Sequence, residues 1–159
     1  TPMIYIIDTN SFGVLKNYYP AIFESFWEKF DELVEDGRVT SVREVSKELN
    51  RREDSEHLTE WIEENSRIFS PPTEDELEFV SQIFSVQHFQ QLIGEKQLLK
   101  GYPVADPFLI AKAGIIEGGC VITEEKLKPH AAKIPNVCSH FNIDCTNIQG
   151  MLERENWNL

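Results

Sequence analysis

The sequence predicts an α/β fold with a small parallel sheet of about four to five strands, flanked by many helices. Short apolar runs of strand character recur far apart in the chain. Between them, apolar residues recur every three to four positions, which is helical spacing. Strands separated by helices favour parallel pairing with helical crossovers. With 159 residues and no long linker, a single domain over residues 3–159 is expected.

In the amino-terminal half, each predicted element has its own signal. An apolar run rich in Ile and Tyr indicates a buried strand, and bulky apolar residues at helical spacing indicate the long helix that follows. Asp36-Gly37 ends that helix, and Ser41 and Glu44 have the spacing of a capping box that opens another. The expected elements are a strand over 3–7, a helix over 19–35, a strand over 38–40 and a helix from 41 to 51 or 52.

The carboxy-terminal half is richer in helix signals. Pro71-Pro72 interrupts the chain, after which Thr73 and Glu76 form a second capping-box pair. Pro107 suits the first turn of a helix. The expected elements are helices over 56–66, 73–84, 89–99 and 107–117, strands over 120–123 and 143–148, and a terminal helix over 151–157.

The charge balance limits the classes of partner. The net charge is −12, from 15 basic and 27 acidic residues, which argues against a broad basic surface for nucleic acid. It does not exclude a nuclease, whose acidic metal site adds to the count, and it suits a basic protein partner. No apolar run approaches the ~20 residues that a membrane span needs. The three cysteines and a start without a basic segment favour the cytoplasm.

Carboxylates occur at four places that the predicted fold can bring together: Asp8, Glu48, Asp106 and Glu125. The carboxyl ends of parallel strands meet at one rim of the sheet, where ligands of such folds bind. At about 5 Å and an effective dielectric constant of about 20, each like-charged pair costs roughly 3 kcal/mol. Such a cluster takes up protons or binds a cation. Hard oxygen ligands favour Mg²⁺ or Mn²⁺.

Several of these carboxylates also have a local interpretation. Asp8 can cap the turn that follows the first strand, and Asp106 can be the N-cap of its helix. A capping box explains Glu44 without chemistry. Glu48 lies one helical turn later on the same face and has no such explanation, so it is the preferred site residue of the two.

The fourth position is a pair of neighbours after the strand over 120–123. Either Glu124 or Glu125 is the ligand in this interpretation, and the other is a solvated loop charge. Thr123 can hydrogen-bond inside the cluster. Asn10 can orient Asp8 or a metal-bound water, although a role as a turn residue explains it equally well.

Four short motifs follow one another in a specific order. They are Asp8-Thr9-Asn10 after the first strand, Glu48-Leu49 in an early helix, Ala105-Asp106-x-x-Leu109-Ile110-Ala111, and Val121-Ile122-Thr123-x-Glu125. Together they resemble the PIN-domain nucleases over about residues 3–150. The chain looks closest to the PIN-like toxins of prokaryotic toxin–antitoxin pairs, the VapC-type group, and the stretch 133–138 is similar to one subgroup of these. Two departures are a Glu where the family's last acidic residue is commonly Asp, and a longer segment between Glu48 and Asp106.

The resemblance implies a PIN-like three-layer sandwich and a metal-dependent endoribonuclease. The family's acidic motif maps onto Asp8, Glu48, Asp106 and Glu125. One or two Mg²⁺ or Mn²⁺ ions would be held by Asp8, Asp106 and Glu125, with Glu48 as a direct or water-mediated ligand. The resemblance further implies a toxin that acts on RNA, a cognate antitoxin that inhibits it, and a homodimer.

Three alternatives stay open. The first is a non-catalytic PIN-like module that binds RNA or protein, and the second is a nuclease directed at DNA. The third is a phosphohydrolase on a similar sheet, which is weakened because Asn10 stands where haloacid-dehalogenase-type phosphatases have a second Asp. For an RNA substrate, the basic residues near the motifs are the expected phosphate contacts: Arg51, Arg52, Lys96, Lys100, Lys112, Lys126 and Lys128.

Overall fold

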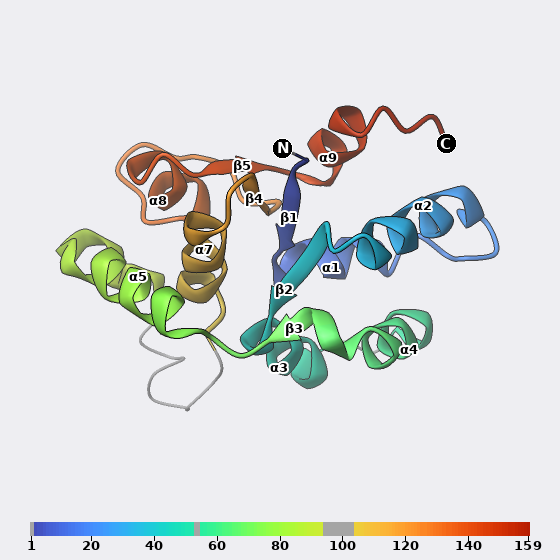
Figure 1. Ribbon diagram of the computed structural model, residues 1–159, viewed down its shortest axis with the longest axis horizontal. Helices are drawn as coiled ribbons and strands as arrows, with labels where there is room; N and C mark the ends of the chain where they lie inside the picture. Colours follow the sequence, from blue (N-terminus) through green and yellow to red (C-terminus); the bar gives the residue numbers. More distant parts are fainter. Residues whose placement is uncertain (1, 53–54, 94–103) are drawn as a thin grey trace.

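The computed structural model describes residues 2–52, 55–93 and 104–159 (Figure 1). Its sheet has five strands, all parallel, in the order β3-β2-β1-β4-β5. This confirms the predicted α/β class with a small parallel sheet. The strands are β1 (Ile4–Ile7), β2 (Val39–Val42), β3 (Phe69–Ser70), β4 (Gly119–Ile122) and β5 (Asp144–Thr146).

Helices cover both faces of the sheet. Figure 1 shows α5, α7 and α8 on one side of the strands, and α1, α2 and α4 on the other. These three layers are consistent with a PIN-like sandwich. Among the described residues, no helix is long and apolar enough to cross a membrane. The helices are α1 (Thr9–Leu15), α2 (Glu24–Glu35), α3 (Arg43–Arg52), α4 (Glu56–Glu64), α5 (Glu74–Ser85), α7 (Asp106–Ile115), α8 (Ile134–His140) and α9 (Ile148–Arg154), with short 3₁₀ turns η1 (Ser66–Ile68) and η2 (Gln87–Leu92).

The central strand is buried on both faces, which is why its sequence is continuously apolar rather than alternating. Tyr5, Ile6 and Ile7 of β1 are fully buried. Helix α7 packs against β1, β2 and β4 from one side, and α2 packs on β2. The apolar residues of the sheet and of both helical layers form one hydrophobic core.

The register of the strands brings distant segments to the same rim. Ile7 of β1 is level with Ile122 of β4. The next residue, Asp8, donates its backbone N–H to the Ile122 carbonyl at 3.0 Å. Asp8 and Thr123 are therefore neighbours at the carboxyl ends of two adjacent strands, as expected for a ligand-binding rim.

Of the two predicted capping boxes, one is wrong and one is confirmed. Ser41 lies inside β2, and its hydroxyl donates to the Ile7 carbonyl at 2.7 Å rather than capping a helix. The strand is therefore longer than predicted, and α3 begins only at Arg43. At the second position, the Thr73 hydroxyl accepts the backbone N–H of Glu76 at 3.1 Å and donates to its carboxylate at 3.0 Å.

Other boundaries differ where the local signal was short. The helix expected from residue 19 begins at Glu24, after a run of turns. The terminal helix begins at Ile148, because the Asn147 side chain caps it by accepting the Gly150 N–H at 2.8 Å. The two-residue strand β3 and the seven-residue helix α8 had no predicted counterpart. Of the helix expected over 89–99, residues 89–92 belong to the 3₁₀ turn η2 and 94–99 lie outside the described residues.

Glu155 ties the carboxy-terminal segment to the centre of the sheet. It accepts the Tyr5 hydroxyl at 2.5 Å and pairs with two nitrogens of Arg38 at 3.0 and 2.6 Å. We expect Glu155→Ala to lower the free energy of unfolding by about 2 kcal/mol, because partly buried partners lose charged hydrogen bonds. Thermal unfolding measures this change. The control is Glu153→Ala, which removes an exposed carboxylate and should change the stability by less than about 0.5 kcal/mol. Equal effects of the two variants would contradict this role of Glu155.

Candidate functional site

All four carboxylates predicted from the sequence line one cavity of about 150 Å³, which we call the acidic cavity. They come from the end of β1, the helix α3, the first residue of α7 and the loop after β4. Residues that lie far apart in the sequence thus line one small volume at the carboxyl ends of the strands. The residues that matter for its chemistry are Asp8, Thr9, Asn10, Glu48, Asp106 and Glu125.

Asp8 is held in a fixed orientation. Its side chain is only 2% exposed, and its Oδ1 accepts the backbone N–H of Ser11 at 2.7 Å, which caps α1. The Thr123 side chain also hydrogen-bonds its carboxylate, whereas the Ser11 hydroxyl donates to the Ile122 carbonyl at 3.2 Å. Burial raises the pKa of Asp8, and these hydrogen bonds oppose that rise. Asp8 is therefore both a helix cap and a wall of the acidic cavity. Ser11 was not predicted, although its place three residues after Asp8 is the usual one for a capped N–H.

Asp106 is repelled by all three other carboxylates of the cavity. It is the first residue of α7, and Ala105 is the N-cap, so the predicted capping role of Asp106 is wrong. Burial, followed by repulsion from Glu125, Asp8 and Glu48, raises the pKa of Asp106 to about 8. This carboxylate is therefore largely protonated near neutral pH unless a cation enters the cavity.

Glu48 is turned into the cavity by a contact between two helices. The Thr9 hydroxyl of α1 donates to the Glu48 carboxylate of α3 at 2.5 Å. Thr9 was not singled out from the sequence, although it follows Asp8 directly. Glu44, one turn earlier, is buried and does not line the acidic cavity. Its Oε1 lies 3.4 Å from Nη2 of Arg43. The sequence-based preference for Glu48 over Glu44 agrees with this placement.

The structure separates the two neighbouring glutamates after β4. The Glu124 carboxylate accepts the backbone N–H of Ile148 at 3.1 Å, at the start of α9. Glu125 instead lines the cavity, and Thr123 accepts its backbone N–H at 3.1 Å. Burial raises the pKa of Glu125, as does Asp8, while Lys133 and a hydrogen bond from the backbone N–H of Ile134 lower it. Glu125 therefore lines the cavity, whereas Glu124 does not line it and acts on it through its charge, which raises the pKa of Asp8.

Lys133 is the basic residue that sequence reasoning missed. Its positive charge lowers the pKa of both Asp106 and Glu125, so its side chain lies within electrostatic reach of the cavity. Its position at the N-cap of α8 places it there, and α8 was not predicted. Lys112 donates instead to the Ser70 hydroxyl at 2.5 Å. Three of the predicted phosphate contacts lie outside the described part of the chain: Lys96, Lys100 and the side chain of Arg52.

The acidic cavity has the chemistry of a divalent-cation site. Its charged side chains are all carboxylates, whose oxygens Mg²⁺ and Mn²⁺ prefer, and its volume is sufficient for a cation with several waters. A cation bound among the carboxylates would relieve their mutual repulsion. Over residues 2–52, 55–93 and 104–159, no three acidic, His or Cys side chains are already arranged as metal ligands. Binding would therefore have to draw the carboxylates inward.

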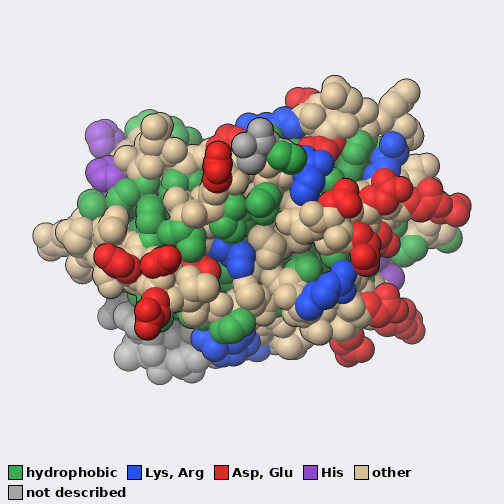
Figure 2. Space-filling view, in the orientation of Figure 1, with side chains coloured by type: hydrophobic (Ala, Val, Ile, Leu, Met, Phe, Trp, Pro, Cys, Tyr) green, Lys and Arg blue, Asp and Glu red, His purple; other side chains and the backbone are tan. Residues whose placement is uncertain are grey.

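Much of the protein's negative charge lies away from this cavity. Figure 2 shows Asp and Glu side chains gathered over α2 and α4. Both helices expose carboxylates along their length, whereas α2 carries one lysine and α4 carries no Lys or Arg. The net charge of −12 is therefore spread over the surface as well as the cavity, where Lys133 partly offsets the four carboxylates.

The fold and the site define an α/β protein with an acidic cavity at the carboxyl ends of a parallel sheet. The chain belongs to the family described as "Domain of unknown function (DUF4411)", which matches residues 5–159. No curated protein and no solved structure matches the chain significantly. The family description assigns no activity, so the functional conclusion depends on the chemistry of the cavity.

Proposed function

We propose that this protein is a metal-dependent endoribonuclease that hydrolyses RNA phosphodiesters. One observation carries the proposal: Asp8, Glu48, Asp106 and Glu125, predicted as a nuclease motif, line the same small cavity. Burial and mutual repulsion raise the pKa of Asp106 and Glu125, and burial raises that of Asp8. Such an arrangement is unfavourable in an empty site and favourable around a cation.

In this proposal each carboxylate has a stated role. Asp8, Asp106 and Glu125 would hold Mg²⁺ or Mn²⁺, and Glu48 would hold it directly or through a water. The bound cation would lower the pKa of the attacking water and neutralise charge on the scissile phosphate. Thr9 orients Glu48, while Ser11 and Thr123 orient Asp8. Lys133, whose charge acts on Asp106, would attract the phosphate toward the cavity.

The biological setting is proposed from the resemblance of the motifs to PIN-like toxins. The protein would act in the cytoplasm as the toxin of a toxin–antitoxin pair, as a homodimer, and a cognate antitoxin would inhibit it. The acidic surface over α2 and α4 suits a basic protein partner (Figure 2).

A matched pair of neighbouring glutamates tests the proposal. We expect Glu125→Gln to lower Mn²⁺-dependent cleavage of a labelled RNA by at least about 100-fold, because even indirect partners of metal ligands contribute 10- to 100-fold. Glu124→Gln should change the rate by less than about threefold, because its amide oxygen can still accept the Ile148 N–H. The initial rates of both variants are compared with the wild type at saturating Mn²⁺.

The same assay separates the alternative functions. Equal losses in the two variants would contradict the assignment of Glu125. Cleavage of single-stranded DNA at the RNA rate would identify a nuclease without sugar selectivity, and turnover of a chromogenic phosphate ester alone would identify a phosphohydrolase. Saturable Mn²⁺ binding by a folded wild type that cuts neither polymer would favour the non-catalytic module.

A further inference from the structure

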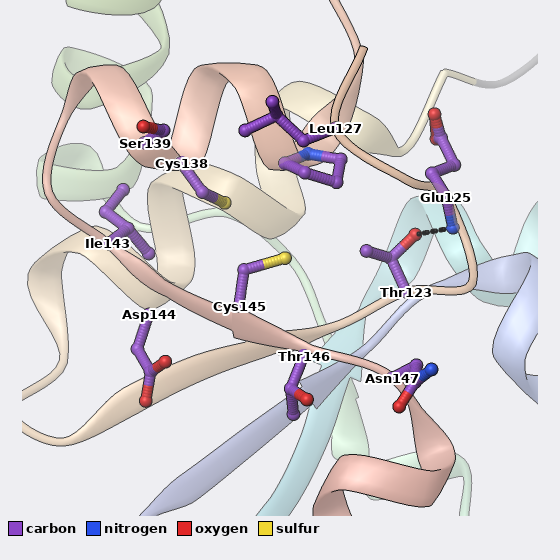
Figure 3. A pocket seen from close by; sticks show the side chains of 11 residues that line it. Thr123, Glu125, Leu127, Cys138, Ser139, Ile143, Asp144, Cys145, Thr146 and Asn147 are labelled. Carbon is purple, nitrogen blue, oxygen red and sulfur yellow. Dashed lines mark hydrogen bonds between the residues drawn. The ribbon is translucent and has the colours of Figure 1, made fainter.

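A second, larger pocket opens beside the acidic cavity. It has a volume of about 510 Å³ and is formed mainly by β5, α8 and the loop after β4, and we call it the β5–α8 pocket (Figure 3). Glu125 lines both this pocket and the acidic cavity. Thr123, at the same end of the pocket, hydrogen-bonds Asp8 of the acidic cavity. The two hollows therefore meet at Thr123 and Glu125.

The lining of the β5–α8 pocket is mixed rather than acidic. Leu127 is 58% exposed, and Leu127, Pro135 and Ile143 give the pocket apolar surface. Ser139 and Asn147 contribute a hydroxyl and an amide on other sides of the pocket (Figure 3).

The charge in this pocket is concentrated at the end it shares with the acidic cavity. At the far end, the Asp144 carboxylate forms an ion pair with Arg154 at 2.7 and 3.2 Å. That pairing compensates its charge. Glu125 lies at the shared end, with the charge of Lys133 acting on it. A ligand that fits both hollows would therefore be neutral and partly apolar at the Asp144 end. At the Glu125 end, where the carboxylates repel an anion, it would carry a phosphate only together with a cation in the acidic cavity, and Lys133 adds positive charge there.

A nucleotide has this distribution of chemistry. Its base has apolar faces that pack on apolar side chains and polar edges that hydrogen-bond, and a pocket of this kind with a few polar groups is typical of small-ligand sites. Its phosphate would lie at the shared end, near Lys133 and a cation in the acidic cavity. We propose that the β5–α8 pocket binds the nucleoside adjacent to the scissile phosphate and sets the sequence preference of cleavage. This inference rests on the proposed nuclease function.

Binding of single nucleotides tests the pocket without any requirement for cleavage. The four ribonucleoside 5′-monophosphates are titrated into Mg²⁺-loaded protein, and amide chemical shifts are followed by NMR. We expect at least one of them to give saturable shifts at Ser139, Cys145 and Thr146. The variant Ser139→Trp fills the pocket from an exposed position on α8 and should weaken this binding at least tenfold. The matched control Ser81→Trp, exposed on α5, should leave it unchanged.

Two binding outcomes would overturn the inference. One is the absence of saturable shifts in the β5–α8 pocket for all four nucleotides. The other is equal affinity in Ser139→Trp and Ser81→Trp, with both variants shown to be folded by thermal unfolding. A second variant, Leu127→Ala, removes the exposed apolar wall without adding bulk and should weaken binding about threefold or more.

Sequencing of RNA cut sites separates this inference from the proposed function. If the wild type cleaves RNA and Ser139→Trp cleaves with the same rate and the same preference, the pocket inference fails and the nuclease proposal stands. If nucleotides bind in the pocket but metal-loaded wild type cleaves no RNA, the nuclease proposal fails and the pocket remains a nucleotide site. A changed preference in Ser139→Trp supports both.

Discussion

Asp106→Asn is expected to abolish most RNA cleavage while making the metal-free protein more stable. Activity falls by at least about 100-fold, because the variant loses a charged oxygen that would hold the cation. The stability rises because burial and the repulsion from Glu125, Asp8 and Glu48 no longer act on a charge. Near pH 8 the gain should be several kcal/mol, since the pKa of Asp106 is raised from 3.8 to about 8 and each pKa unit corresponds to about 1.4 kcal/mol.

Opposite signs for activity and stability distinguish a functional carboxylate from a structural one. Cleavage rates and chemical denaturation of the same preparations measure both quantities. The control is Asp36→Asn, which removes an exposed carboxylate at the end of α2. It should leave the cleavage rate unchanged and alter the stability by less than about 0.5 kcal/mol. A large loss of stability in Asp106→Asn would show that its carboxylate supports the fold, and would contradict this account.

The second large effect is a change in the pH dependence of stability when a divalent cation binds. The folded-state pKa of Asp106 is raised to about 8 and that of Asp8 and Glu125 is also raised, so the folded state binds more protons than the unfolded state. Stability without metal should therefore fall as the pH rises from about 5.5 toward 8.5. Saturating Mn²⁺ competes with those protons, so it should stabilise the protein more at pH 8.5 than at pH 5.5.

The expected size follows from the binding equilibrium. At a Mn²⁺ concentration about 100 times the dissociation constant, the stabilisation is about 2.7 kcal/mol, or roughly 5–10 °C in melting temperature for a chain of this length. Differential scanning fluorimetry at both pH values measures it, with Glu124→Gln as a variant that keeps the shift and Asp106→Asn as one that loses most of it. A shift that is equal at both pH values, or unchanged in Asp106→Asn, would place the bound cation elsewhere.

The sequence was sufficient to predict the fold class and three of the four carboxylates that share the acidic cavity, and for the fourth it left Glu124 and Glu125 as alternatives. Asp8 and the Glu124-Glu125 pair could be predicted as site residues because each comes after an apolar run that clearly indicates a strand. Glu48 was chosen over Glu44 by excluding a capping role, and the choice agrees with the cavity although the capping box itself was wrong. Ser41 has capping-box spacing, yet its hydroxyl bonds the neighbouring strand, because tertiary contacts decided the end of β2.

The remaining features depend on contacts that spacing does not encode. The fold brings Ile148 beside Glu124, whose carboxylate accepts the Ile148 N–H at the start of α9, while Glu125 lines the cavity. Lys133 reaches the site because the short helix α8 begins beside it, and a seven-residue helix with an early proline has too few turns for a periodic signal. The β5–α8 pocket likewise arises from packing between two elements, one of which was not predicted.

Cleavage of a labelled panel of structured RNAs by the purified wild type tests the central claim most directly. Reactions contain Mn²⁺ or Mg²⁺, EDTA, or EDTA followed by excess metal, beside the Asp8→Asn variant, whose amide can still cap α1. We expect cleavage that requires the metal, returns when metal is restored, and is lost in Asp8→Asn with its fold intact. Cleavage that persists in EDTA or in Asp8→Asn, or none by a folded, metal-saturated wild type, would contradict a metal-dependent ribonuclease centred on the acidic cavity.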